Sequence, residues 1–168
     1  MIRRYFLALA AGVMLTACAG TIPEAETTYY LVRHAEKTKD KKDPALTEAG
    51  IKRAQDLAIR LKDVPITKIY SSDYKRTRDT AAPITAMMGL DVVIYNPRDL
   101  EGFSQALLKE TGHILVVGHS NTTPGLSELL GGDSGSPIVE ATEYDRLYIL
   151  KKRGGVITTS ITRYGETS

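Results

Sequence analysis

The sequence predicts an α/β domain with a mainly parallel sheet. Short apolar runs, typical of buried strands, recur along the chain of 168 residues. Between the first four runs lie longer segments whose apolar residues recur every three or four positions, which is typical of amphipathic helices. A last pair of runs, separated by Gly154-Gly155, predicts two closing strands. Strands that alternate with helices favour a parallel sheet covered by helices.

Each element follows from a local pattern. Thr47 is placed to cap a helix that contains Ile51 and Leu57 on its apolar face. A second helix is predicted from about Asp73, with a kink or break near Pro83. Gly131-Gly132 predicts the end of the last helix. The predicted strands are residues 29–32, 66–70, 92–95, 114–117, 146–150 and 156–161, and the two remaining helices are residues 103–109 and 124–130.

Composition limits the function classes. The length suits one domain, and 42% hydrophobic with 25% charged residues is normal for a packed globular protein. With 22 basic and 20 acidic side chains, the net charge of +2 is too small to predict a nucleic-acid partner. The single cysteine, Cys18, excludes an intrachain disulfide framework and a zinc site built from cysteines.

The N-terminus has the pattern of a secretory signal. Arg3 and Arg4 precede an uncharged, mostly apolar stretch over residues 5–17, which is shorter than the roughly 20 residues that span a bilayer. Leu15-Thr16-Ala17-Cys18 resembles the bacterial lipoprotein signal motif. The resemblance implies cleavage before Cys18 and acylation of that residue, which would anchor the protein to a membrane.

This interpretation sets the domain boundaries and the location. We expect a signal peptide over residues 1–17, a tether over residues 18–27 and one domain over residues 28–168. The residue after the cysteine is Ala19 and not Asp. This resembles the pattern of Gram-negative lipoproteins that are sorted to the outer membrane. The expected location is therefore the cell envelope, on the periplasmic side. Because both basic residues of the signal leave with it, the remaining chain carries equal numbers of basic and acidic side chains.

Three predicted strands end in unusual residues. The first ends in Arg33-His34, the second leads through Ser71-Ser72 to Arg76, and the fourth ends in Gly118-His119. In a parallel sheet these ends lie at one edge, where ligands bind. Guanidinium groups bind phosphate oxygens in a bidentate fork, and imidazole can accept a phosphoryl group. The pattern predicts an anion site with a nucleophile. His113 begins its strand and is interpreted as structural.

These residues lie in motifs of a known family. The segments Leu31-Val32-Arg33-His34-Ala35-Glu36, Leu46-Thr47-Glu48-Ala49-Gly50, Tyr70-Ser71-Ser72 to Thr80-Ala81, and Val116-Val117-Gly118-His119-Ser120 stand in order. Together they resemble the blocks of the histidine phosphatase superfamily, which includes phosphoglycerate mutases; Ala35 replaces the usual Gly. The resemblance implies a three-layer sandwich with a mainly parallel mixed sheet, in a short form without a cap domain.

The resemblance also implies roles and a substrate class. His34 resembles the nucleophile that forms a phosphohistidine, Arg33 and Arg76 resemble the clamp on the phosphoryl oxygens, and His119 resembles the second histidine. Such a site uses no metal and no cofactor, because its cations supply the countercharge. The expected partner is a small phosphorylated substrate or a phosphoprotein. Arg78 points away from the Arg76 face and is expected at the surface, with Asp79 as a possible neighbour.

The general acid is left open. Larger family members carry it after the third strand, and Asp99 and Glu101 are the candidates there. Glu36 is interpreted as a carboxylate that orders the loop. The run EKTKDKKD over residues 36–43 is a solvated loop or a basic rim that attracts anions. The absence of a long insertion predicts an open pocket that accepts bulky substrates.

Two other functions are suggested by parts of the sequence. Gly118-His119-Ser120 resembles part of the G-x-S-x-G turn of α/β-hydrolases. The last position of that motif is Gly, whereas this chain has Thr122 there. The catalytic triad also requires a histidine after the nucleophile Ser120, and the last histidine in the sequence is His119. The second alternative is a lipoprotein of the same fold that binds a phosphorylated ligand without turnover. The weak acid motif favours this alternative, and the set of Arg33, His34, Arg76 and His119 opposes it.

Overall fold

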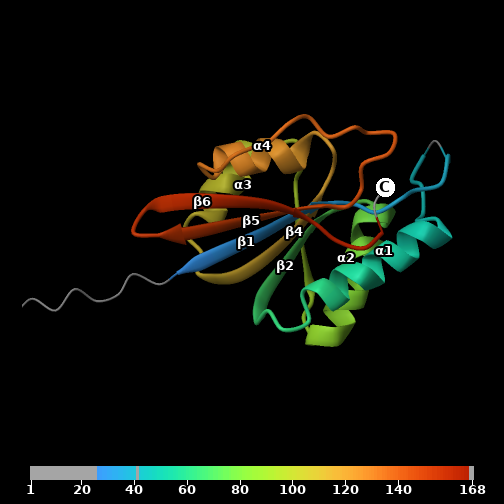
Figure 1. Cartoon of the computed structure of the whole chain (residues 1–168), viewed down its shortest axis with the longest axis horizontal. Coiled ribbons are helices and arrows are strands. Elements are labelled where there is room, and N and C mark those ends of the chain that lie inside the picture. The colour runs from blue at the N-terminus through green and yellow to red at the C-terminus, as the bar shows by residue number, and fades with distance from the viewer. Residues whose placement is uncertain (1–25, 41, 167–168) are drawn as a thin grey trace, which may run out of the picture.

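The computed structural model describes residues 26–40 and 42–166, which form a six-stranded sheet (Figure 1). The strands are β1 (Thr27–Arg33), β2 (Ile66–Ser72), β3 (Val92–Tyr95), β4 (Gly112–Gly118), β5 (Arg146–Arg153) and β6 (Val156–Arg163). Their order is β3-β2-β4-β1-β5-β6. The predicted signal peptide, Cys18 and most of the predicted tether lie outside the described residues.

The sheet is mostly parallel and lies between two layers of helices. β1, β2, β3 and β4 pair in parallel, whereas β5 pairs antiparallel with β1 and with β6. Two helices, α1 (Glu48–Arg60) and α2 (Lys75–Met88), cover one face. The shorter α3 (Leu100–Leu107) and α4 (Thr122–Leu129) cover the other (Figure 1). The predicted three-layer α/β class is confirmed.

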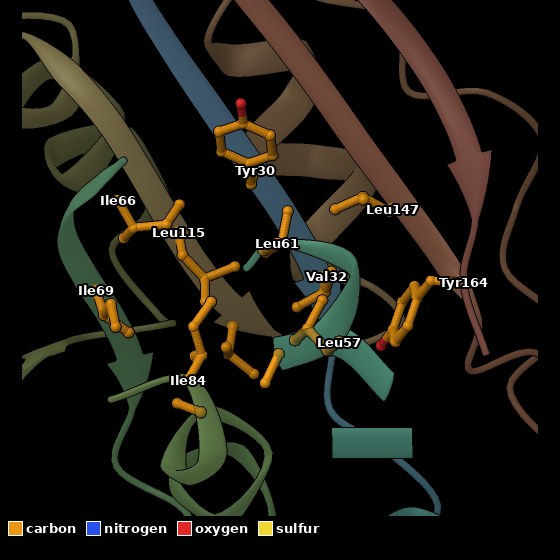
Figure 2. Packing of buried hydrophobic residues seen from close by; sticks show 13 residues of the cluster. Tyr30, Val32, Leu57, Leu61, Ile66, Ile69, Ile84, Leu115, Leu147 and Tyr164 are labelled. Atoms are coloured by element: carbon orange, nitrogen blue, oxygen red, sulfur yellow. The ribbon is translucent and has the colours of Figure 1, made fainter. Parts of the chain in front are cut away.

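The alternation of side chains along β1 explains why the sheet needs both layers. Tyr30 and Val32 belong to the core beneath α1 and α2, together with Leu57 and Ile84 from those helices (Figure 2). The intervening residues Tyr29 and Leu31 belong to the core beneath α3 and α4. Because successive strand residues point to opposite faces, an apolar run on β1 buries side chains on both.

The start of α1 is fixed by a cap and by a close approach. The Thr47 side chain accepts a hydrogen bond from the Gly50 amide, which confirms the predicted cap. A Cβ atom on Gly50 would lie 2.2 Å from the backbone oxygen of Glu36. The glycine therefore lets the helix begin directly against the loop that follows β1, and this loop carries the first site residues.

Helices α2 and α3 differ from prediction for reasons that the structure shows. The predicted break at Pro83 is wrong, because α2 runs through Pro83 to Met88. Ala81 and Ile84 are fully buried against the sheet, and this packing outweighs the loss of one backbone donor. Helix α3 begins three residues earlier than predicted, because the Asp99 side chain caps it through the Gly102 amide.

The closing hairpin matches its prediction. The turn between β5 and β6 is formed by Gly154 and Gly155, with φ of 56° and 76°. Both values lie in the left-handed region, which glycine occupies without steric cost. Within the described residues, no helix is long and apolar enough to cross a membrane.

Leu57→Ala should lower the free energy of unfolding by about 2–5 kcal/mol, because the Leu57 side chain is fully buried between α1 and the sheet and its removal leaves a cavity. Ile59→Ala is the matched control, since Ile59 lies on the same helix and is 64% exposed; it should change stability by about 0.5 kcal/mol or less. Urea denaturation measures both. Equal losses in the two variants would contradict the packing described for α1.

Candidate active site

The three predicted strand ends meet at one edge of the sheet. Arg33 at the end of β1 pairs with Gly118 at the end of β4, and the His34 amide donates a hydrogen bond to the Gly118 carbonyl at 2.9 Å. Ser71 of β2 pairs with Val117 of β4. A cavity of about 500 Å³ opens at this edge. It is lined by His34, Lys37, Tyr74, Arg76, Pro97, Arg98, His119, Ser120, Asn121, Thr122 and Glu140.

Arg33 is a buried cation with two unused donors. Its side chain is 1% exposed, and its guanidinium carbon lies 4.0 Å from the ring centroid of Tyr144. Its Nη1 donates to the Glu143 carbonyl at 2.8 Å. Its Nε and Nη2 have no hydrogen-bond partner among the described residues. Burial lowers the pKa of Arg33, but a guanidinium keeps its charge. These two donors form a fork that fits an oxyanion.

His34 is held as a neutral base. Its Nδ1 lies 2.8 Å from the Ala35 carbonyl, and since a carbonyl only accepts, Nδ1 carries the proton. The lone pair is therefore on Nε2. Burial lowers the pKa of His34 to about 3; the Ala35 bond opposes this shift, and the charges of Arg33 and Arg76 add to it. The neutral ring has the form that a nucleophile requires.

His119 faces His34 and is oriented by two neighbours. The ring centroids of the two histidines lie 5.5 Å apart. Arg76 Nη2 lies 3.3 Å from His119 Nδ1, and because a guanidinium only donates, Nδ1 accepts. His119 Nε2 therefore carries the proton and donates to Ser72 Oγ at 2.9 Å. Burial, with the charges of Arg76 and Arg33, lowers the pKa of His119 to about 4.

Arg76 comes from the first turn of α2 and faces the cavity. Its guanidinium carbon lies 4.4 Å from the centroid of Tyr74, and its Nε has no hydrogen-bond partner among the described residues. The Oδ1 atom of Asp43 lies 3.9 Å from Nη1 of Arg76. Arg78, two residues on, is 43% exposed and pairs with Asp73. The ion-pair partner of Arg78 is thus Asp73, which precedes the start of α2, and not the Asp79 named from the sequence as a possible neighbour.

Two other predicted residues lie away from the cavity. His113 is at the opposite end of β4, where its ring stacks against Tyr30. Glu36 accepts three hydrogen bonds from Arg53 of α1, at 2.7–3.0 Å, and so ties the loop after β1 to the helix. Both placements agree with the structural roles expected from the sequence.

The carboxylates are arranged differently from the sequence expectation. Asp99 caps α3, and neither Asp99 nor Glu101 lines the cavity. The carboxylate that lines it in the described part of the chain is Glu140, from the connection between α4 and β5. No motif marks Glu140, Tyr144 or Arg98, and only the fold brings these residues to the strand ends. In the described ranges no group of three or more His, Cys, Asp or Glu forms a metal-ligand cluster.

The fold and the site define a class. His34 and Arg76 line one cavity, and the guanidinium of Arg33 is buried next to it. A neutral imidazole with two such guanidinium groups, both with unused donors, is suited to phosphoryl transfer, where positioning and positive charge supply most of the catalysis. Residues 29–98 match the model of the histidine phosphatase superfamily, branch 1. This match covers less than half of the chain, and the fold of the described residues is phosphoglycerate mutase-like.

A curated relative matches the same region. The probable phosphoglycerate mutase GpmB of Erwinia tasmaniensis is 40% identical over 76 residues, which are 41% of this chain and 35% of the relative. The chain thus spans about a third of the length of the curated relative that it matches.

Two solved structures extend the likeness of the fold. The mycobacterial glucosyl-3-phosphoglycerate phosphatase superposes with a TM-score of 0.64 at 15% identity, over 85% of this chain and 100% of that one. The protein histidine phosphatase SixA, complexed with tungstate, superposes with a TM-score of 0.63 at 19% identity, over 82% of this chain and 96% of that one. At these identities the likeness establishes the fold alone.

The rings of His34 and His119 should both remain neutral at pH 5.5 in the ligand-free protein, because burial holds their pKa values at about 3 and about 4. At pH 5.5 the solution lies above both values, so the deprotonated form dominates. The ¹⁵N chemical shifts of the imidazole nitrogens measure this directly. Protonation of either ring with a midpoint near the ordinary value of about 6.5 would contradict the buried arrangement.

Proposed function

We propose that the protein is a phosphatase that hydrolyses a phosphomonoester or a phosphohistidine through a covalent phosphohistidine on His34. One observation carries this proposal. Buried Arg33 has unused Nε and Nη2 donors, and its guanidinium is close enough to the neutral imidazole of the adjacent His34 for its charge to lower the pKa of that ring. An isolated buried donor is costly, so a pair of such donors at a nucleophile indicates a bound oxyanion.

The first chemical step follows from the tautomer of His34. With the phosphoryl oxygens held by Arg33 and Arg76, the lone pair on Nε2 attacks phosphorus. The Nε2–P bond forms as the bond from phosphorus to the leaving atom breaks, and the leaving atom takes a proton. The Nδ1 proton stays on the ring, where the Ala35 carbonyl stabilises the charge of the phosphohistidine. Water then attacks phosphorus, and the neutral imidazole is released.

Arg76 and His119 stabilise the transferring group from the other side. When an oxyanion occupies the cavity, Arg76 Nη2 and the free Nε of Arg76 can both turn to it. The Ser72 contact holds the His119 ring against the same cavity. Because these groups are placed before substrate binds, little reorganisation is needed as charge develops.

The activities for which the similar proteins are named support this class of reaction. One is a glucosyl-3-phosphoglycerate phosphatase and another a protein histidine phosphatase that holds tungstate, an oxyanion. The curated relative bears the name of a mutase. In this chain the cavity is open at the sheet edge, so water has access to the phosphohistidine and hydrolysis is favoured over transfer back to an alcohol.

His34→Ala should lower the hydrolysis of 4-nitrophenyl phosphate by roughly three orders of magnitude or more, since it removes the atom that accepts the phosphoryl group. The assay is run with EDTA at mildly acidic and neutral pH. Appreciable residual turnover in the variant would contradict the phosphohistidine mechanism. Retained phosphate binding by the wild-type protein, with no turnover of any ester or phosphohistidine peptide, would favour the non-catalytic binding lipoprotein.

Two arginines on one helix provide the control. Arg76→Ala removes a side chain that faces the cavity, and a loss of roughly 10²–10³-fold is expected. Arg78→Ala removes an exposed side chain that pairs with Asp73, and activity should stay within about twofold. Similar losses in both would show that the catalytic contribution of this turn is structural.

We further propose that acylated Cys18 anchors the protein on the periplasmic side of the cell envelope, at the outer membrane. This proposal rests on the sequence motif, since Cys18 lies outside the described residues. Cys18→Ser should move the protein from the membrane fraction to the soluble fraction of a Gram-negative host, because the acyl chains are lost. Continued sedimentation of the variant with outer membranes would contradict a lipid anchor.

A further inference from the structure

We infer that Glu140 is the acid–base residue of this site, and that the substrates are phosphomonoesters of neutral or cationic alkyl alcohols. The inference rests on the proposed phosphatase function and specifies its acid and its substrate class. It differs from the expectation that the acid is Asp99 or Glu101.

The composition of the cavity wall selects Glu140. The other charged side chains that line it are Lys37, Arg76 and Arg98, and buried Arg33 lies behind it. Glu140 is close enough to Arg33 for its charge to raise the pKa of that guanidinium, against the lowering effect of burial. In the described part of the chain it is therefore the carboxylate available to a substrate held between His34 and His119. An exposed carboxylate at the mouth of a cationic cavity can exchange protons with water between turnovers.

The turn that carries Glu140 is held by Arg33, the residue proposed to bind the phosphoryl group. The Glu143 amide donates to the Val139 carbonyl at 2.8 Å, and the Val139 amide donates to the Glu143 carboxylate at 3.0 Å. That carboxylate is also paired with Arg146 and Arg163. The carbonyl of Glu143 accepts the hydrogen bond from Arg33. The guanidinium that would hold the phosphoryl group thus also holds the turn that presents Glu140, in the long connection after α4 (Figure 1).

A second hollow extends from the cavity past Glu140. It has a volume of about 400 Å³ and shares Ser120, Asn121 and Glu140 with the first cavity. Its other lining residues are Pro124, Gly125, Glu128, Ser134, Gly135, Pro137 and Ile138. No lysine or arginine lines it within the described residues, whereas two carboxylates do. An anionic group would be repelled there, and a neutral or cationic one would be accepted.

Glu140 lines both the cavity and the second hollow, and this position indicates where the alcohol of the substrate binds. An acid must lie within hydrogen-bond reach of the oxygen that it protonates. With phosphorus beside His34, an ester oxygen near Glu140 directs its alcohol into the second hollow. Alkoxides are poor leaving groups and need this proton, while the imidazole of a phosphohistidine needs it less. Glu140 therefore favours alkyl phosphomonoesters as substrates.

The proton balance closes over the two steps. In the first, Glu140 gives its proton to the ester oxygen as the Nε2–P bond forms and the P–O bond breaks, which releases a neutral alcohol. In the second step, the oxygen of a water molecule bonds to phosphorus as the N–P bond breaks, and the Glu140 carboxylate takes a proton from that water. Phosphate leaves, and both His34 and Glu140 return to their starting forms.

Glu140→Gln tests the role through two substrates that differ in their need for an acid. The measured quantity is kcat/KM, which includes steps up to formation of the phosphohistidine and alcohol release. For ethanolamine phosphate, with its alkyl leaving group, a loss of roughly 10²-fold or more is expected. For 4-nitrophenyl phosphate, whose phenolate leaves readily, the loss should be below about tenfold. Equal losses, or no loss with ethanolamine phosphate, would overturn the role of Glu140.

Asp99→Asn and Glu101→Gln make the direct comparison with the acids expected from the sequence. Asparagine can still cap α3, so the first substitution leaves the helix start intact. Selective loss with ethanolamine phosphate in either of these variants, in place of Glu140→Gln, would overturn the inference. Selective loss confined to Glu140→Gln supports it.

The leaving-group site is tested by charge. The wild-type protein should have a higher kcat/KM for ethanolamine phosphate than for 3-phosphoglycerate, and Glu128→Gln should reduce this preference. The reverse preference would overturn the placement of the alcohol, as would turnover of 4-nitrophenyl phosphate with no alkyl phosphate accepted. Absence of turnover with every ester would instead overturn the proposed phosphatase itself.

Discussion

The burial of the Arg33 guanidinium is the constraint on which the rest of the site depends. Taking a charge out of water costs several kcal/mol unless partners compensate it. Here the Glu143 carbonyl and the face of Tyr144 supply part of the compensation, and two donors are left unused. A phosphoryl group would supply the remainder. Arg33 ends the central strand β1, and its backbone position is set by its pairing with Gly118 of β4 and by the pairing of the preceding Val32 with Leu147 of β5.

This one residue links three parts of the molecule. Through β1 it is adjacent to His34, through its charge it helps to keep His34 and His119 neutral, and through Glu143 it fixes the turn of Glu140. Affinity for an anion therefore comes from a local cluster of cations, not from the net charge of the chain, which is only +2. The neutral histidines also avoid adding buried charge to a site that already holds two guanidinium groups.

The sequence predicts the fold well where local pattern and packing agree. The apolar runs locate the six strands of the described residues, and the ends of the parallel strands place His34, Arg76 and His119 around one cavity, with Arg33 buried next to it. The sequence is less informative where tertiary contacts decide. Helix α2 continues through Pro83 because its neighbours are buried, a fact that no local pattern contains. Glu140 could not be identified from the sequence for a similar reason, since no motif marks the connection between α4 and β5, which is held at the site by the hydrogen bond from Arg33 to the Glu143 carbonyl.

The most direct test of the central claim is to locate the phosphoryl group on the protein during turnover. The reaction with a phosphomonoester is quenched under alkaline conditions, which preserve the N–P bond, and the peptides are sequenced by mass spectrometry. We expect a phosphoryl group on His34, labile in acid, and none on His119 or Ser120. A phosphoryl group on another residue, or rapid turnover with no phosphorylated protein, would contradict it.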